Sequence, residues 1–584
     1  MPSILDTLGD DFFKALEKAP QAGELSEAER FNAIVITPST QSQYGDYQCN
    51  SAMKLAKVFK LPPRAVADQL VANLGNSPAI EQVEIAGPGF INITLSKVWL
   101  EQRLIEIQQS DRLGISPPKN PQRVIVEFSS PNIAKELHVG HLRSTIIGEH
   151  IARLFEFLGH DVLRLNHVGD WGTAFGMLIH FIKSTHPNFL SETEWIELSD
   201  LVIWYREAKQ RFDADEVFKS ASRLEVVALQ SGDPTNLEIW KQICQISRRG
   251  FSEIYHLLDV TLEERGESFY NPMLAEVVED LENKGLITVS DGAKCCFLEG
   301  FTSREGEPLP MIVQKSDGGF NYSTTDLAAL KHRIEVEKAD RIIITTDAGQ
   351  ALHFQMLLKA SQMAGTYDPA KTRVDHVTFG LVLGPDGKKF RTRSGETESL
   401  MNLLQTAINK AAEGLKERSP EISEEEMMES ARVLGIGAVK YADLSTNRTG
   451  DYQFSYEKML RFDGNTAAFI LYAYVRTQNI LKRIGHSHSL TPPHPISLNH
   501  PSERALGLQL ARFEETLETV AEELMPNKLT EYLYRLAELF NAFYRDCHVE
   551  GSDEVDSRGE LCSLTGKTLH CGLSLLGIHT LERM

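Results

Sequence analysis

The pattern of apolar and polar residues divides the chain into an N-terminal α/β module, a central region of strands and helices, and a helical C-terminal part. Residues 1–112 form the first module, with apolar residues at helical spacing and two short strand-like runs. The predicted elements are helices at 4–17 and 65–74 and strands at 82–85 and 90–95. A stretch at 117–122 that is rich in Pro, Lys, Asn and Gln is typical of a linker.

The central region begins with a strand, a turn, a helix, a turn and a second strand. The strands are predicted at 123–128 and 162–165, and the amphipathic helix between them at 138–158. This order predicts a parallel sheet. Ligands bind at the carboxyl edge of such a sheet, where the polar run 166–172 follows the second strand.

The strand pattern is then interrupted and resumes later. Residues 183–304 are helical and charged, then loop-rich. Strands are predicted again at 311–314, 341–345 and 377–383, with a helix at 351–363. We therefore predict a Rossmann-type domain made of residues 113–182 and 305–400, split by a connective insertion at 183–304.

The C-terminal part is predicted to be helical from about residue 400 onward. The acidic run 421–429 suits the positive end of a helix dipole. From Gly464 to the end, apolar residues recur at helical spacing, which favours a helix bundle. We assign residues 401–463 to a helical linking region and residues 464–584 to the bundle.

Composition narrows the class of protein. With 584 residues and 42% hydrophobic residues, the chain can bury several cores, and about four domains are expected. The net charge of −21 argues against binding of nucleic acid through bulk charge, but it does not exclude a local basic face. Seven cysteines without a CxxC pair argue against a thiolate zinc site and fit a reducing compartment. Without a signal peptide, a transit peptide or a bilayer-spanning run, a soluble cytoplasmic protein is expected.

The motif His138-Val139-Gly140-His141 stands where the central helix should begin. Free backbone N–H groups and the helix dipole make a helix start an anion site, and the two imidazoles share one face of the helix. Gly140 has no side chain, so a flat ligand such as a purine can approach the backbone. The motif therefore indicates chemistry on the phosphates of ATP. The alternatives are two capping or surface histidines, or a zinc site, for which no third ligand stands in register.

The motif resembles the HIGH signature of class I aminoacyl-tRNA synthetases. The strings around it at 127–135 and 142–148, and two later strings at 169–172 and 321–327, closely resemble the arginyl-tRNA synthetase family. The resemblance covers essentially the whole chain. HxGH alone is shared with other nucleotidyl transferases, whereas the combined strings are highly specific.

The resemblance implies an architecture and an activity. The fold would be a Rossmann-type parallel-sheet α/β catalytic domain with a helical insertion, an N-terminal α+β domain and a C-terminal all-α anticodon-binding bundle. The activity would be that of an arginine–tRNA ligase, which forms arginyl-adenylate from L-arginine and ATP. It then transfers arginine to the 3′-terminal adenosine of tRNA(Arg), with the tRNA bound before activation. Mg²⁺ would accompany ATP, no zinc or membrane would be involved, and the family suggests a monomer.

The second class I signature, Lys-Met-Ser-Lys-Ser, is altered in this chain. Lys389 keeps the first lysine, Thr392 replaces the second, and Arg393 follows. In the arginyl subgroup a lysine just before HxGH is thought to compensate, and Lys135 stands there. Cations are needed because charge develops on the leaving pyrophosphate. The alternative is a flexible basic turn after the glycines of this loop.

The resemblance also implies a pocket for the substrate arginine. Asp326 would bind the guanidinium, since a carboxylate does so through two hydrogen bonds, and Tyr322 lies four residues before it on the same helical face. The other implied contacts are Glu127, Ser129, Asn132 and Gln350. Without the resemblance, a core tyrosine and a surface acid would be the better interpretations of Tyr322 and Asp326. His353 is assigned to ATP binding, although a plain helix-start histidine is an equally good interpretation.

The start of the C-terminal bundle carries aromatic and basic residues. Asn465, Tyr472, Tyr474 and Arg476 are predicted to bind tRNA, because unstacked anticodon bases stack on aromatic rings. For each residue taken singly, a core or surface position is a strong alternative. By resemblance, the N-terminal module contacts the elbow of tRNA.

Two other functions are weighed against this one. A class I synthetase for another amino acid would fit HxGH but not the Tyr322 and Asp326 string. A non-catalytic tRNA-binding paralogue often loses its ATP histidines, and both are intact here.

Overall fold

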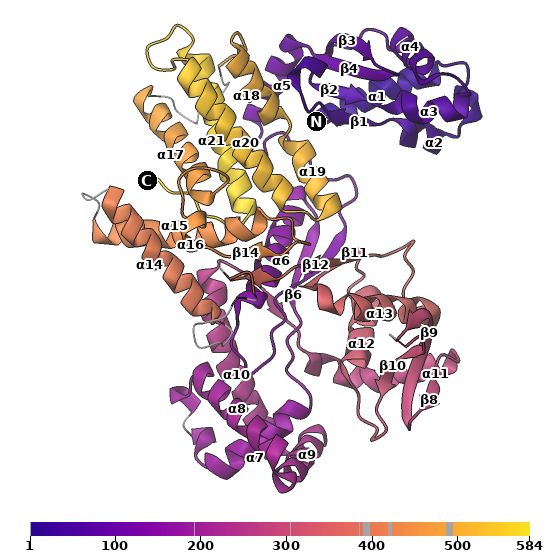
Figure 1. The fold of residues 1–584 in the computed structure, drawn as a ribbon, viewed down its shortest axis with the longest axis vertical. Coiled ribbons are helices and arrows are strands. Elements are labelled where there is room, and N and C mark those ends of the chain that lie inside the picture. Colours follow the sequence, from indigo (N-terminus) through magenta and orange to yellow (C-terminus); the bar gives the residue numbers. More distant parts are fainter. Residues whose placement is uncertain are drawn as a thin grey trace.

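The structure is a computed structural model, which describes residues 2–191, 193–303, 305–384, 386–388, 390, 398–418, 423–485 and 494–584. Figure 1 shows a central α/β region, with the N-terminal domain and the C-terminal helices at one end of the long axis and the helical insertion at the other. None of the helices within these ranges is both long enough and apolar enough to cross a membrane.

The N-terminal domain packs helices on a four-stranded antiparallel sheet of order β1-β2-β4-β3. The strands are β1 Ile36–Pro38, β2 Tyr47–Cys49, β3 Ile80–Ala86 and β4 Phe90–Leu95. The helices are α1 Ile4–Glu17, α2 Glu27–Ala33, α3 Ser51–Phe59 and α4 Pro63–Asn73, and α5 Lys97–Gln109 leads out of the domain. The two predicted helices and two predicted strands are confirmed. The pattern missed β1 and β2, because runs of three residues are too short to show a period. The helices α2, α3 and α5 were also not predicted.

A five-stranded parallel sheet lies at the centre of the molecule (Figure 1). Its order is β12-β11-β5-β6-β7, and every neighbouring pair is parallel. The strands are β5 Arg123–Glu127, β6 Asp161–Asn166, β7 Glu263–Glu264, β11 Arg341–Asp347 and β12 Arg373–Phe379. Helix α6 Val139–Leu158 connects β5 to β6, and α13 Ala351–Ala364 connects β11 to β12. The predicted parallel sheet is therefore confirmed.

Strand β5 shows why this sheet is buried on both faces. Val124 and Val126 belong to one hydrophobic core, whereas Ile125 between them belongs to a second core on the other face. Alternate residues of a strand point to opposite faces, so a strand covered on both sides is apolar throughout.

The insertion is a group of four helices at the lower end of Figure 1: α7 Thr173–Thr185, α8 Leu198–Ala214, α9 Glu216–Gln230 and α10 Pro234–Leu257. It begins earlier than residue 183, because α7 starts at Thr173. It also ends earlier than residue 304, because β7 returns to the parallel sheet beside β6. A two-residue strand carries too short a pattern to be recognised in the sequence.

The prediction that residues 311–314 resume the parallel sheet is wrong. They belong to β10 Pro308–Gln314, which pairs antiparallel with β9 Ala293–Thr302. With β8 Thr288–Ser290, these strands form a separate three-stranded sheet, next to α11 Leu274–Asn283 and α12 Tyr322–Glu335. A short apolar run shows that a strand exists but not which strand it pairs with.

Among the described residues from Leu400 onward, the chain is helical, with one exception. The helices are α14 Leu400–Arg418, α15 Glu424–Leu444, α16 Tyr456–Met459, α17 Ala467–Arg483, α18 Pro501–Ala511, α19 Phe513–Glu523, α20 Asn527–Asp546 and α21 Val555–Leu575. Ser423 caps α15, whose first turn holds the predicted acidic residues Glu424, Glu425 and Glu426. The exception is β14 Tyr452–Gln453, which pairs in parallel with β13 Val382–Leu383 outside the central sheet.

Candidate active site

The turn after β5 is held in an unusual backbone conformation. Ser129, Ser130 and Ala134 have φ values of 69°, 48° and 59°, in the left-handed region that non-glycine residues rarely adopt. Distant side chains accept hydrogen bonds from their N–H groups: Ser144 Oγ, Asn166 Oδ1 and Ser247 Oγ, each at 3.0 Å. Strained backbone that the surroundings fix in this way is typical of functional sites.

His138 and His141 form the start of α6, as predicted. His138 is the N-cap residue, and its Nδ1 accepts a hydrogen bond from Gly140 N at 3.1 Å. His141 Nδ1 accepts one from His138 N at 3.1 Å, and the two ring centroids are 4.1 Å apart. Because each Nδ1 is an acceptor, a neutral ring carries its proton on Nε2.

His141 is a neutral donor rather than a cation. Burial lowers the pKa of His141 to about 3, and the neighbouring His138 and Lys135 act in the same direction. At Gly140 a Cβ atom would lie 2.9 Å from His138 Cε1, so any other residue would push against the imidazole. Glycine at position 140 therefore allows the His138 ring to fold back over the start of the helix.

Behind this helix start lies a cavity of about 520 Å³ at the carboxyl edge of the parallel sheet. Nine of the residues predicted for ATP or arginine line it: Glu127, Ser129, Asn132, His138, Gly140, His141, Tyr322, Asp326 and Gln350. They come from β5, the following turn, α6, α12 and the turn after β11. The cavity therefore brings together segments that are up to about 220 residues apart in the chain.

One end of the cavity is acidic. Asp326 Oδ2 lies 2.6 Å from His353 Nε2, and Asp326 Oδ1 lies 3.6 Å from His167 Nε2. The Tyr322 ring packs edge-on against His353, with centroids 4.9 Å apart. Tyr322 is 60% exposed, so it is not a core tyrosine. His353, which was assigned to ATP, lies against the two residues that were assigned to arginine.

Glu267 is a lining residue that the sequence did not reveal. It starts a 3-10 helix, Glu267–Met273, directly after β7, and its N–H donates to Val168 O at 3.0 Å. Burial, together with the nearby Asp326 and Asp170, raises the pKa of Glu267 to about 8. No motif surrounds this glutamate. Glu267 could have been predicted as a site residue only by recognising that the chain returns to the parallel sheet at β7.

The remaining residues predicted for arginine also line the cavity. Glu127 is buried and forms an ion pair with Arg333, with 2.5 Å between Oε2 and Nη1. Ser129 Oγ lies 2.7 Å from Tyr255 Oη, and the backbone of Asn132 pairs with that of Gly169. Gln350 Nε2 donates to Asp347 Oδ2 at 3.3 Å. The charge of Glu127 is thus already paired with that of Arg333 in the absence of substrate.

Of the three predicted cations, Lys135 alone lies within the described residues. Lys135 is exposed, and its Nζ lies 5.6 Å from the centre of the Tyr205 ring in the insertion, rather than on the cavity wall. Lys389 and Arg393 lie outside the described residues, as does Thr392.

The four residues predicted to bind tRNA do not form one cluster. Arg476 lies over the Tyr472 ring at 4.7 Å and donates to Asn541 Oδ1 at 2.8 Å. Tyr474 instead packs 6.0 Å from the His570 ring, because residues two apart face different sides of a helix. The four residues therefore lie at separate positions, and tRNA binding by them stays a prediction.

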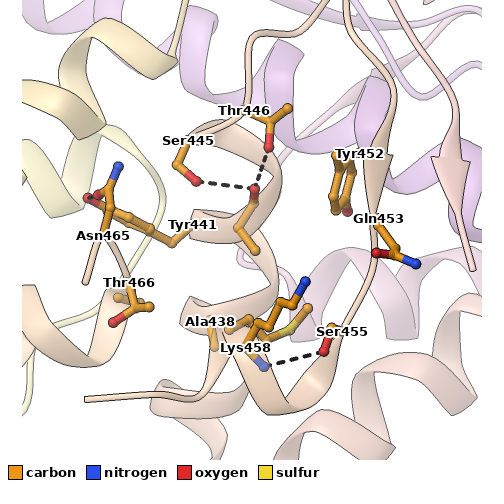
Figure 2. Close-up of a pocket in the computed structure, with 13 residues that line it drawn as sticks. Ala438, Tyr441, Ser445, Thr446, Tyr452, Gln453, Ser455, Lys458, Asn465 and Thr466 are labelled. Carbon is orange, nitrogen blue, oxygen red and sulfur yellow. Dashed lines mark hydrogen bonds between the residues drawn. The ribbon is translucent and has the colours of Figure 1, made fainter. Parts of the chain in front are cut away.

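Asn465 lies in a second cavity, of about 210 Å³, between α15, β14, α16 and α17. Its Oδ1 accepts a hydrogen bond of 2.6 Å from Tyr441 Oη, and Figure 2 shows the two side chains together. Lys458 lies on the opposite side of this cavity, near Ser455.

Comparison with known proteins now adds a second line of evidence. The family model for "tRNA synthetases class I (R), catalytic domain" matches residues 104–456. The arginine–tRNA ligase of Protochlamydia amoebophila is 57% identical over 586 residues, covering all of both chains. The chain belongs to the arginyl-tRNA synthetase family.

Other matches to arginyl-tRNA synthetases extend over every domain. Two further family models, the arginyl-tRNA synthetase N-terminal domain and the DALR anticodon-binding domain, match residues 7–95 and 470–584. The Chlamydia felis arginine–tRNA ligase is 53% identical, over 94% of this chain and 95% of that one. The arginyl-tRNA synthetase structure from Plasmodium falciparum covers all of both chains, with a TM-score of 0.85 and 32% identity. That from Thermus thermophilus shares the fold, with a TM-score of 0.80 and 24% identity.

Proposed function

We propose that the 520 Å³ cavity activates L-arginine with ATP and then transfers it to the 3′-terminal adenosine of tRNA(Arg). The observation that carries the proposal is the meeting of two chemistries in one cavity. A helix start with two imidazoles suits a polyphosphate, and an acidic end suits a guanidinium. The arginine carboxylate would attack the α-phosphorus and release pyrophosphate. The terminal ribose hydroxyl would then attack the adenylate carbonyl and release AMP.

At the phosphate end, His138 and His141 are proposed to donate from Nε2. A neutral donor stabilises phosphate charge without being repelled by the nearby Lys135, and Gly140 lines the cavity beside the two imidazoles. Lys135, Lys389 and Arg393 are proposed to supply the positive charge. Lys135 would have to leave the Tyr205 ring to reach the triphosphate.

At the acidic end, Asp326 and Glu267 are proposed to share the guanidinium, with Tyr322 and Gln350 beside them. His353 is proposed to orient Asp326 rather than to bind ATP, since the two groups are 2.6 Å apart. Glu127, Ser129 and Asn132 are proposed to face the α-amino end of the substrate. Because Arg333 already neutralises Glu127, we propose that the guanidinium is bound by the other two carboxylates.

We propose that residues 464–584 bind the anticodon and residues 1–112 the elbow of tRNA. Tyr472 and Arg476 are the favoured base contacts, since the half-buried Arg476 lies over the exposed ring of Tyr472, while Asn465 and Tyr474 would act from separate positions. The catalytic domain would consist of residues 113–172 and of the later strands β7, β11 and β12 with helices α12 and α13, and residues 401–463 would form a linking region.

ATP is proposed to enter as its Mg²⁺ complex, so that the ion belongs to the substrate. Within the described ranges no group of three or more His, Cys, Asp or Glu side chains is arranged to hold a metal. We also propose a monomeric, cytoplasmic protein, and the seven free cysteines are compatible with a reducing compartment.

Charging assays test the proposal. The purified chain should attach arginine, and no other amino acid, to a tRNA(Arg) transcript in the presence of MgATP. Charging of a different amino acid would show that the acidic end serves another substrate. Binding of tRNA with no charging at all would point to a non-catalytic paralogue.

A further inference from the structure

Arg143 is the largest side chain in the structure that is completely buried. It lies on α6, two residues after His141, and reaches segments far away in the chain. Its Nε forms an ion pair with Asp443 on α15, at 3.1 Å from Oδ2. Its Nη1 donates to Gly380 O at 2.8 Å and to Gly450 O at 3.1 Å. The helix that begins with HxGH is thus bound to three other segments through one guanidinium.

One of these segments, at Gly380, is the root of the basic loop that contains Lys389, and another, at Gly450, lies against it. Gly380 and Leu381 follow β12 and lead through β13 into that loop. The loop root is bonded to the stretch after α15: Gly380 N donates to Arg448 O at 2.9 Å, and Leu381 N to Asp451 Oδ1 at 2.6 Å. The β13–β14 pairing continues this contact. The residues that lead into the basic loop are therefore bonded to the C-terminal helical part, although they directly follow a strand of the parallel sheet.

The contact between the two segments is close. A Cβ atom at Gly380 would lie 2.4 Å from Gly450 O, so only glycine allows the backbones to approach this far. The rings of Phe379 and Tyr452 cover the guanidinium, at 5.7 Å and 5.3 Å from its carbon. A planar fork presents its donors from separate nitrogens to the carboxylate and to the two carbonyls, whereas a lysine ammonium would present its three donors from a single nitrogen.

A buried charge of this kind is costly unless it is fully paired, and a well-packed apolar group is often as good for stability. Stability alone therefore does not explain why this position carries an arginine. Its contacts instead connect the two parts of the site that must act on one triphosphate: the HxGH helix start and the root of the basic loop.

We propose that Arg143 is a positioning residue for arginine activation. With Asp443 it holds Gly380, at the root of the basic loop, against the helix that starts at HxGH. The two histidines and the proposed cations of the loop would then bind the phosphates of the same ATP molecule. The inference rests on the proposed function, since it assigns Arg143 a part in that reaction.

Three variants test the proposal in the full-length chain. Asp443→Asn removes the charge but keeps the shape, and Arg143→Lys keeps the charge but not the fork. Gly380→Ala leaves the ion pair intact and moves the loop root away from Gly450. In tRNA-dependent ATP–pyrophosphate exchange, kcat should fall about 100-fold in each, because small errors in position are costly in catalysis. The arginine KM should stay within about twofold, since these contacts do not reach the acidic end.

Glu514→Gln is the matched control. Glu514 pairs with Arg103 at 3.0 Å, also with both side chains largely buried, but between the N-terminal domain and α19. This variant should keep the wild-type kcat, while circular dichroism shows whether each protein is folded.

The outcomes separate the possible failures. If the wild-type protein shows no ATP–pyrophosphate exchange in the presence of arginine, the proposed function is wrong, independently of the role of Arg143. Active wild type with an unchanged kcat in folded Asp443→Asn would overturn the positioning role. A raised ATP KM at unchanged kcat in Arg143→Lys would also overturn it, by showing a direct substrate contact. If Asp443→Asn does not fold, Gly380→Ala decides, because it keeps the buried ion pair.

Discussion

At neutral pH, Glu267 is mostly protonated in the free enzyme, because burial and the nearby Asp326 raise its pKa to about 8. About one tenth of the molecules carry the ionised carboxylate at about pH 7. A guanidinium beside Glu267 favours the ionised form, so arginine binding lowers this pKa and releases a proton. Arginine affinity should therefore rise as the pH rises through 8 and level off above it.

The size of the effect follows from the ionised fraction. Between about pH 7 and about pH 8.5, the arginine KM should fall about eightfold. The measurements end at about pH 8.5 because the α-amino group of free arginine begins to lose its proton at higher pH. Calorimetry in buffers of different ionisation enthalpy should detect a release of about 0.9 proton on arginine binding at about pH 7.

Glu267→Gln should abolish both the pH dependence and the proton release. Glu515→Gln is the control, since Glu515 is another carboxyl with a raised pKa, about 7, which lies on α19 and accepts a hydrogen bond from Tyr47. That variant should keep the wild-type slope. An arginine KM that is flat across the range in the wild type would refute the assignment of Glu267 to the guanidinium.

Five further variants test other parts of the protein. His138→Ala and His141→Ala should each lower the kcat of activation about 100-fold with little change in arginine KM, because only phosphate stabilisation is lost. With its pKa at about 3, His141 should cause no change in wild-type rate between about pH 5 and 8. Asp326→Asn should raise the arginine KM between about 10- and 100-fold, through loss of a charged hydrogen bond. Lys135→Ala should slow activation more than it weakens tRNA binding, and Arg476→Ala should raise the tRNA KM about tenfold.

Each of these has a contradicting result. Wild-type exchange rates in both histidine variants would remove them from the phosphate site, and a histidine titration near pH 6 would show that a charged imidazole acts. An unchanged arginine KM in Asp326→Asn would place the guanidinium elsewhere. Weaker tRNA binding at an unchanged activation rate would make Lys135 a plain RNA contact. An unchanged tRNA KM in Arg476→Ala would show that Arg476 does not contribute to tRNA binding.

Local pattern was enough to predict the phosphate end of the site. A strand, a polar turn and a helix that starts at HxGH are neighbours in the sequence, and β5 and α6 have the predicted form. The helix begins at Val139 with His138 as its cap, one residue later than predicted. Asp326 and Tyr322 were found only through family resemblance, since a helix carrying a tyrosine and an acid has many ordinary explanations.

The parts that were missed depend on contacts between distant segments. Glu267 enters the cavity because β7 pairs with β6 about 100 residues after that strand, and no local pattern records this pairing. Residues 311–314 were assigned to the wrong sheet for the same reason. Arg143 appears in the sequence as one more residue of an amphipathic helix. Its partner Asp443 is 300 residues away, so its role can be inferred only from the structure.

The central claim is that one cavity joins an ATP site to an arginine site. The most direct measurement is ATP–pyrophosphate exchange with tRNA(Arg) present, run with each standard amino acid in turn. The account predicts exchange with arginine alone, and loss of that exchange in His141→Ala. Exchange that is equal with another amino acid, or that persists in full in this variant, would contradict it.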